Sequence, residues 1–254
     1  MELDVTIKEI TFGQSITRIE VPEKLRMKMP TGLGYFDSAL GGKGMTPSVV
    51  TLVTGDPGAG KTTLNLILAD YLAAQKYAVI YNGAEESAFQ TKLTSERLRL
   101  KAGFGMGQES NIDSLLTKFD KYVNLPANKG KHPVLFVDSL QSMSDGRFDT
   151  GRITSKSAEI VLQKLTNYAK KTYCNIFVIG QVSKSGKFAG SNKLKHMVDA
   201  HIELTIETDE KSDFFSQRKL FTSKNRFGGC GMLSYLKIHA QGFEETARAN
   251  IVNM

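Results

Sequence analysis

Apolar and polar positions alternate along this chain with two different periods, one typical of buried strands and one typical of amphipathic helices. Apolar runs with the length of buried strands occupy residues 49–53, 78–81, 134–137 and 175–179. Between these runs, apolar residues recur three and four positions apart over 64–72 and 158–169, and a further helix is expected over 90–100. Strands that alternate with helices predict an α/β domain in which a mainly parallel, twisted sheet is flanked by helices.

The two ends of the chain follow other patterns. Beyond residue 198, apolar residues such as Ile202 and Leu204 occupy every second position, which is typical of half-exposed strands. We therefore expect antiparallel strands within 199–239 to extend the sheet at its C-terminal side. Apolar residues over 5–21 predict a pair of short strands before a charged linker. The predicted organisation is an N-terminal strand and linker segment over 1–29, followed by one α/β domain over 30–254.

Composition adds an electrostatic preference to this picture. Lysine and arginine total 33 against 26 aspartates and glutamates in 254 residues, a formal charge of +7 that favours polyanions such as nucleic acids or nucleotides. The two cysteines, Cys174 and Cys230, are too few for a disulfide framework or a four-cysteine zinc site. The N-terminus lacks the apolar core of a signal peptide, and no apolar run reaches the ~20 residues of a membrane span. A reduced, cytoplasmic location is therefore the expectation.

One segment satisfies the pattern G-x-x-x-x-G-K-S/T and lies between an apolar strand and an amphipathic helix. In such a loop the glycines let backbone N–H groups converge on a phosphate, and the helix N-terminus adds positive charge. Lys61 would reach the β- and γ-phosphates, and the Thr62 hydroxyl would coordinate Mg²⁺. The sequence therefore predicts a site for ATP and Mg²⁺. The expected nucleotide-binding residues are Gly55, Asp56, Pro57, Gly58, Ala59, Gly60, Lys61, Thr62 and Thr63.

Acidic and amide side chains at the ends of other predicted strands are candidates to complete this site. Asp138 directly follows an apolar strand and is expected to hold Mg²⁺ through water, the alternative being a plain aspartate in a turn. Glu85 and Glu86 follow the strand over 78–81. We favour Glu85 as the base that orients the attacking water and Glu86 as the cap of the next helix, and the reverse assignment stays open. Gln181 is a candidate sensor of the γ-phosphate, or a strand-end residue without a special role.

Further motifs occur in order between residues 28 and 237. They include Ala84-Glu85-Glu86-Ser87, Asp138-Ser139-Leu140-Gln141, Gly180-Gln181-Val182-Ser183-Lys184 and Lys224-Asn225-Arg226-Phe227-Gly228. Together these motifs resemble bacterial RadA/Sms, RecA-like ATPases of DNA recombination and repair, and the motif at 224–228 is the most discriminating. The resemblance implies a RecA-like P-loop NTPase core that hydrolyses ATP with Mg²⁺. It also implies a homo-oligomer, expected as a hexameric ring, that binds single-stranded DNA.

Two segments carry basic and aromatic residues of the kind that binds DNA. Residues 182–196 contain no acidic side chain and are expected to form a flexible loop that neutralises phosphates and stacks on bases. Residues 144–157 are a second candidate, in which acidic residues offset part of the positive charge. For each segment, the alternative is a solvated surface loop. The candidate DNA-binding residues are Arg147, Phe148, Arg152, Lys184, Lys187, Phe188, Lys193 and Lys195.

Lys224 and Arg226 belong to the motif at 224–228, which is the most specific part of the resemblance to RadA/Sms. The resemblance implies an active site between subunits, in which a basic residue from the neighbour reaches the γ-phosphate. Arg226 offers a fork of donors and Lys224 a point charge for that role. The alternative is a basic hairpin end that contacts DNA or solvent.

The sequence departs from full-length RadA/Sms proteins, which also carry a four-cysteine zinc module and a Lon-like domain, so we expect a stand-alone ATPase core. The expected function is a DNA-dependent ATPase of recombination, repair or replication. It would work as a helicase or branch-migration motor on single-stranded or branched DNA. The alternatives are a KaiC-like ATP-switched scaffold that assembles without binding DNA, a RecA-type recombinase that forms filaments, and a P-loop kinase for a small metabolite.

Overall fold

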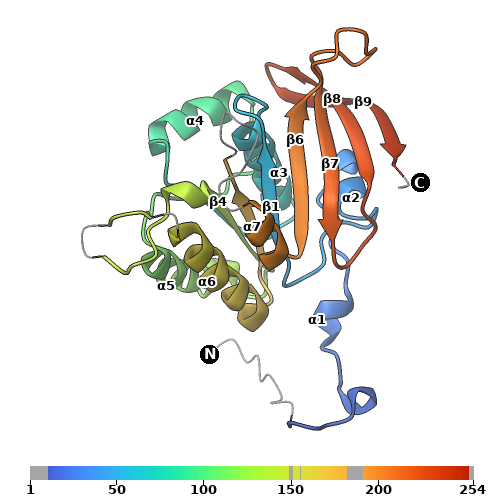
Figure 1. Ribbon diagram of the computed structural model, residues 1–254. Helices are drawn as coiled ribbons and strands as arrows, with labels where there is room; N and C mark the ends of the chain where they lie inside the picture. The colour runs from blue at the N-terminus through green and yellow to red at the C-terminus, as the bar shows by residue number, and fades with distance from the viewer. Residues whose placement is uncertain (1–10, 149–150, 155, 182–190, 252–254) are drawn as a thin grey trace.

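A nine-stranded sheet runs through the part of the chain that the computed structural model describes, residues 11–148, 151–154, 156–181 and 191–251 (Figure 1). The strands lie in the order β3-β2-β4-β5-β1-β6-β7-β8-β9. Their bounds are β1 Val50–Gly55, β2 Ala78–Gly83, β3 Gly105–Gly107, β4 Pro133–Asp138, β5 Asn175–Ile179, β6 Ala200–Ile206, β7 Arg218–Asn225, β8 Met232–His239 and β9 Gly242–Asn250. The helices are α1 Glu23–Arg26, α2 Gly34–Ala39, α3 Lys61–Ala74, α4 Ala88–Arg97, α5 Ile112–Val123, α6 Ser157–Thr172 and α7 Ser191–Met197, with 3-10 turns η1 Ile16–Arg18, η2 Pro126–Asn128 and η3 Leu140–Ser142.

Strand direction divides this sheet into two parts. Strands β1 to β6 pair in parallel, and β6 to β9 pair antiparallel. Because parallel strands end at the same edge, the loop after β1, the glutamates after β2 and Asp138 at the end of β4 meet there. Strand β7 runs the opposite way, so its last residue, Asn225, pairs with Ala200 at the start of β6, on the far edge. The predicted fold, a RecA-like α/β core with antiparallel C-terminal strands, is confirmed.

Each face of the sheet has its own hydrophobic core, because successive strand side chains point to opposite faces. In β4, Val134 and Phe136 pack in the core that contains α3, while Leu135 and Val137 pack in the core that contains α5 and α6. The helical stripes predicted over 64–72 and 158–169 supply these two cores. Both cores hold the strand ends of the parallel sheet in place.

The N-terminal cap of α4 shows where the two glutamates after β2 lie relative to this helix. The Ser87 hydroxyl accepts from the Gln90 backbone N–H at 3.3 Å, and the Gln90 side chain accepts from the Ser87 N–H at 2.9 Å, so Ser87 is the cap of α4. The expectation that Glu86 caps this helix is therefore wrong. Both Glu85 and Glu86 precede the helix and lie at the edge of the sheet, where a ligand would bind.

Two further expectations differ from the structure. The described half of the predicted N-terminal strand pair contains η1 instead of a strand, and Ile16 is 79% exposed because no sheet neighbour covers it. Residues 5–10 lie outside the described residues. Residues 191–196 belong to helix α7 and are not a loop, since Leu194 and Val198 are buried four positions apart in the core with α6. The domain boundary at residues 29 and 30 stays a prediction.

Candidate nucleotide-binding site

The phosphate loop joins β1 to α3 and takes its shape from its glycines. Gly60 lies in the left-handed region with φ 102°, and a Cβ at this position would be 2.8 Å from the Phe243 ring. The Lys61 Nζ donates to the carbonyl oxygens of Gly55 and Asp56, both at 2.8 Å. Burial lowers the pKa of the Lys61 ammonium, and nearby carboxylates oppose this shift. The phosphate loop therefore already holds the Lys61 ammonium group at the place where a phosphate would bind.

The Asp138 carboxylate lies directly behind this loop. Its Oδ2 accepts from the Thr62 hydroxyl at 2.8 Å and from the Tyr81 hydroxyl at 2.6 Å. Burial raises the pKa of the Asp138 carboxyl, while the hydrogen bonds from Tyr81 and Thr62 oppose the shift. A hydroxyl and a carboxylate beside a phosphate cradle are the donor set with which Mg²⁺ is held on a nucleotide. The residues present therefore fit the metal that the sequence predicts.

Glu85 and Gln181 contact each other in the lining of the same cleft, whose volume is about 520 Å³. The Gln181 Nε2 donates to both carboxylate oxygens of Glu85, at 2.8 and 2.7 Å. Glu86 also lines the cleft, but within the described part of the chain the Gln181 side chain bonds to Glu85 and not to Glu86. The cleft is lined by Pro57, Gly58, Gly60, Lys61, Thr62, Thr63, Tyr81, Gly83, Glu85, Glu86, Thr91, Asp138, Ile179, Gln181 and Ile238.

Lys224 and Arg226 do not line this cleft. They lie at and just beyond the end of β7, on the sheet edge opposite the phosphate loop of the same chain. The Lys224 Nζ donates to the carbonyl oxygens of Lys195, His196 and Val198 at 2.7–3.1 Å, so it caps the end of α7. Burial lowers the pKa of the Lys224 ammonium. Arg226 keeps a 49% exposed side chain and pairs with Asp199 at 3.3 Å.

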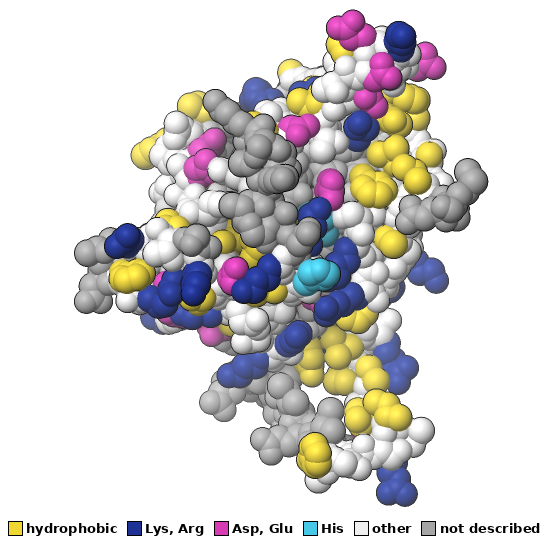
Figure 2. Space-filling view, viewed as in Figure 1, with side chains coloured by type: hydrophobic (Ala, Val, Ile, Leu, Met, Phe, Trp, Pro, Cys, Tyr) yellow, Lys and Arg dark blue, Asp and Glu magenta, His cyan; other side chains and the backbone are white. Residues whose placement is uncertain are grey.

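Lysine and arginine side chains gather across the face that carries the loop after β4 and helices α6 and α7 (Figure 2). In the described part of that loop, an aromatic ring lies close to two cations. The Cζ atoms of Arg147 and Arg152 lie 5.6 and 6.0 Å from the centre of the Phe148 ring, and Phe148 is 40% exposed. A positive face with an exposed ring has the chemistry to hold a single-stranded polyanion.

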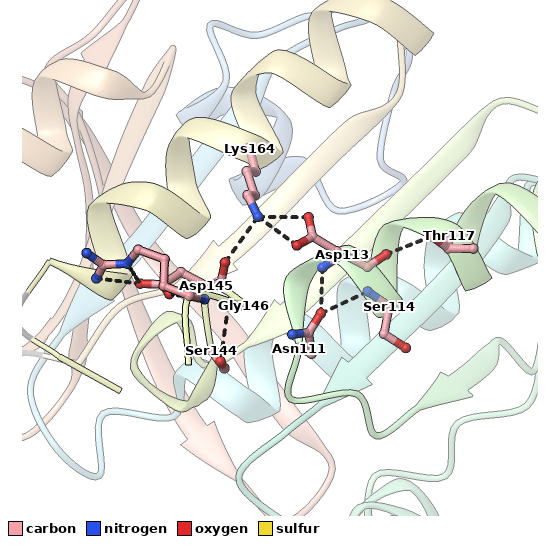
Figure 3. Close-up of polar contacts among 9 residues, drawn as sticks. Asn111, Asp113, Ser114, Thr117, Ser144, Asp145, Gly146 and Lys164 are labelled. Carbon is pink, nitrogen blue, oxygen red and sulfur yellow. Dashed lines mark hydrogen bonds and ion pairs between the residues drawn. The ribbon is translucent and has the colours of Figure 1, made fainter. Parts of the chain in front are cut away.

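The same loop is anchored at its base by α5 and α6 (Figure 3). The Lys164 Nζ donates to both carboxylate oxygens of Asp113, at 2.8 and 2.7 Å, and to the Asp145 carbonyl oxygen at 3.1 Å. Arg147 donates to Asp145 Oδ2 through Nε at 2.9 Å and Nη2 at 2.7 Å, which holds the pKa of that carboxyl well below its usual range. These contacts hold Arg147 and the adjacent Phe148 at the surface.

The other predicted DNA contacts are placed less favourably. Lys193 pairs with Glu159 at 2.5 Å and Lys195 pairs with Glu203 at 2.9 Å, so acidic side chains from the protein itself already neutralise both cations. Lys184, Lys187 and Phe188 lie outside the described residues.

The cleft and the sheet around it define a P-loop NTPase of the RecA fold. Two solved structures share this fold. One is the KaiC-like protein PH0186 from Pyrococcus horikoshii OT3, with TM-score 0.67 and 16% identity over 87% of this chain and 99% of that chain. The other is a solved ATPase domain, with TM-score 0.70 and 13% identity over 89% of this chain and 93% of that chain.

A family model described as "Schlafen group 3, DNA/RNA helicase domain" matches residues 48–222, and the chain belongs to this family. The curated relatives of this chain include proteins named DNA repair protein RadA. The one from Chlamydia pneumoniae is 33% identical over 84% of this chain and 44% of that protein, and the one from Bacillus subtilis (strain 168) is 32% identical over 94% and 49%. The chain spans about half the length of these relatives. The expected resemblance to RadA/Sms ATPases is confirmed.

Within the part of the chain that the structure describes, no helix has the length and apolar character needed to cross a membrane.

Proposed function

We propose that the protein is a DNA-dependent ATPase that acts in the cytoplasm, in recombination, repair or replication, on single-stranded or branched DNA. The observation that carries the proposal is that β4 and the loop after it contribute to both candidate sites. This strand ends at Asp138 in the nucleotide cleft, and the chain continues from there into the anchored loop with Arg147 and Phe148. One strand therefore connects the candidate metal ligand to the candidate DNA surface. The names of the RadA relatives and of the helicase-domain family support the same function.

The side chains of the cleft divide the work of hydrolysis. Lys61 would leave the loop carbonyls for the phosphates, while Thr62 and Asp138 would hold Mg²⁺. The metal would neutralise charge that develops on the phosphates. Glu85 would accept a proton from the attacking water. Gln181, which donates to both carboxylate oxygens of Glu85, would hold this carboxylate in place. Gln181 would thereby connect the base to residue 182 and the predicted DNA loop.

The subunits would assemble as a homo-oligomer, for which we propose a hexameric ring that moves along DNA as a helicase or branch-migration motor. Arg226 supports assembly, because its side chain is exposed at the sheet edge opposite the phosphate loop. From there it cannot reach the phosphate loop of its own chain. A neighbouring chain could use it.

The proposed function predicts that single-stranded DNA raises the rate of ATP hydrolysis of the full chain. The measurement is phosphate release with Mg²⁺, with and without an oligonucleotide, and Lys61→Ala serves as the inactive control. Binding of the same oligonucleotide should weaken with salt, with log affinity falling by about 0.7 per log salt for each neutralised phosphate. An ATPase that neither responds to DNA nor binds it would favour the ATP-switched scaffold instead.

Phe148→Ala is expected to weaken binding of single-stranded DNA by about 1–3 kcal/mol, because the ring would lose its stacking on a base. Fluorescence anisotropy with a labelled oligonucleotide measures the effect at fixed salt. Phe215→Ala is the matched control, since Phe215 is another half-exposed ring, 48% exposed, in the loop between β6 and β7. Equal affinities for the two variants would show that Phe148 does not contact DNA.

A further inference from the structure

Tyr81 places a hydroxyl group against the nucleotide cleft, from the buried strand β2. The residue is 1% exposed, and its ring stacks on Phe136 with centroids 5.8 Å apart and planes 21° apart. Phe136 stacks in turn on Phe177, with centroids 4.9 Å apart. A ring packed in this way has little freedom to rotate, so the hydroxyl position is fixed by the core of the sheet.

The hydroxyl of Tyr81 is directed at a single atom of the candidate metal ligand. It donates to Asp138 Oδ2 at 2.6 Å, and the Thr62 hydroxyl donates to the same oxygen at 2.8 Å. Two hydroxyls from β2 and α3 therefore hold Oδ2, and neither occupies Oδ1. The two bonds to Oδ2 restrict the rotation of the carboxylate, and Oδ1 would be the oxygen available to a hydrated cation. A partner that orients a metal ligand in this way contributes to metal affinity without touching the metal.

We propose that Tyr81 is a positioning residue for the magnesium site and that it acts through Asp138. The inference rests on the proposed function, since it takes the cleft to be a Mg²⁺–nucleotide site. It adds a residue that the motifs do not indicate. Without the Tyr81 hydroxyl, Asp138 would be held by Thr62 alone, and Thr62 is itself a proposed ligand of Mg²⁺. The carboxylate would then have to be ordered when the metal binds.

The test uses Tyr81→Phe in the full chain, because this change removes one oxygen and keeps the stacked ring. Binding of a fluorescent ADP analogue is measured in EDTA and then over a titration with Mg²⁺. Tyr81→Phe is expected to raise the Mg²⁺ concentration at half-saturation by roughly ten-fold, the low end of the range for partners of metal ligands. The affinity measured in EDTA should stay within about two-fold of wild type, since the loop and Lys61 are unchanged.

Two comparisons make this result specific. Tyr122→Phe is the matched control, because the Tyr122 hydroxyl also makes one hydrogen bond, to the Val79 carbonyl at 3.2 Å, and does not contact Asp138. It should leave the Mg²⁺ titration unchanged. In an Asp138→Asn background, Tyr81→Phe should add less than about two-fold, because its effect passes through the carboxylate.

The proposal is overturned if Tyr81→Phe titrates like wild type, if it weakens binding equally in EDTA and in Mg²⁺, or if its full effect persists with Asp138→Asn. A wild-type protein that binds no nucleotide under either condition would instead remove the proposed function. That result is seen before any variant is compared, so the two failures are distinguishable.

Discussion

Glu85→Gln is expected to lower ATP turnover by a factor of about 10²–10⁴ while ATP binding is retained. Glutamine has the same length and can still hydrogen-bond with Gln181, but it cannot accept a proton from the attacking water. Glu85 lines the cleft, and both of its carboxylate oxygens accept from Gln181 Nε2. The measurements are single-turnover hydrolysis at saturating Mg²⁺ and equilibrium binding of a nucleotide analogue.

Glu86→Gln is the control for this prediction, because Glu86 has the same charge, lines the same cleft and is adjacent in sequence. It should keep turnover within about two-fold of wild type. If Glu86→Gln is the inactive variant and Glu85→Gln hydrolyses normally, the two glutamates exchange roles. The contact of Gln181 with Glu85 would then hold a strand end in place rather than a base.

The parts of this molecule that are encoded locally could be predicted from the sequence. The phosphate loop is a contiguous motif, and Asp138 is marked by its position directly after an apolar strand. The helices α3 and α6 follow from the spacing of their apolar residues, although α3 is buried on more than one face over residues 64–69 and its Tyr71 is 44% exposed. The motif at 224–228 carries the resemblance to RadA/Sms ATPases. These signals need no knowledge of which residues meet in space.

Features that depend on tertiary contacts could not be predicted in this way. The apolar residues over 16–21 look like a strand, but a strand needs a neighbour and none covers Ile16. The basic segment 182–196 looks like a loop, whereas the four-residue spacing of Leu194 and Val198 is typical of a helix, as found in α7. Tyr81 looks like one more apolar strand residue until its hydroxyl is placed beside Asp138, 57 positions further along the chain.

Arg226→Ala is expected to reduce ATP turnover by about 10³–10⁵, the contribution of an arginine that stabilises charge on the transferred phosphoryl group. In its own chain Arg226 lies just beyond β7, on the edge of the sheet opposite the phosphate loop, so it could reach only the site of a neighbour. Its partly exposed guanidinium is the better candidate of the two cations, since Lys224 is engaged by three carbonyl oxygens at the end of α7. The loss should therefore arise between subunits.

A mixing experiment tests this origin. Arg226→Ala and Lys61→Ala should each be inactive alone, and an equal mixture should recover activity at roughly a quarter of the interfaces, where an intact Lys61 faces an intact Arg226. Mixing either single variant with the double variant should recover none, because no interface then contains both residues. Recovery in the first mixture alone assigns Arg226 to the neighbouring site. An Arg226→Ala protein that hydrolyses ATP normally and fails to bind the oligonucleotide would place Arg226 on the DNA surface instead, as the basic hairpin end that the sequence also allows.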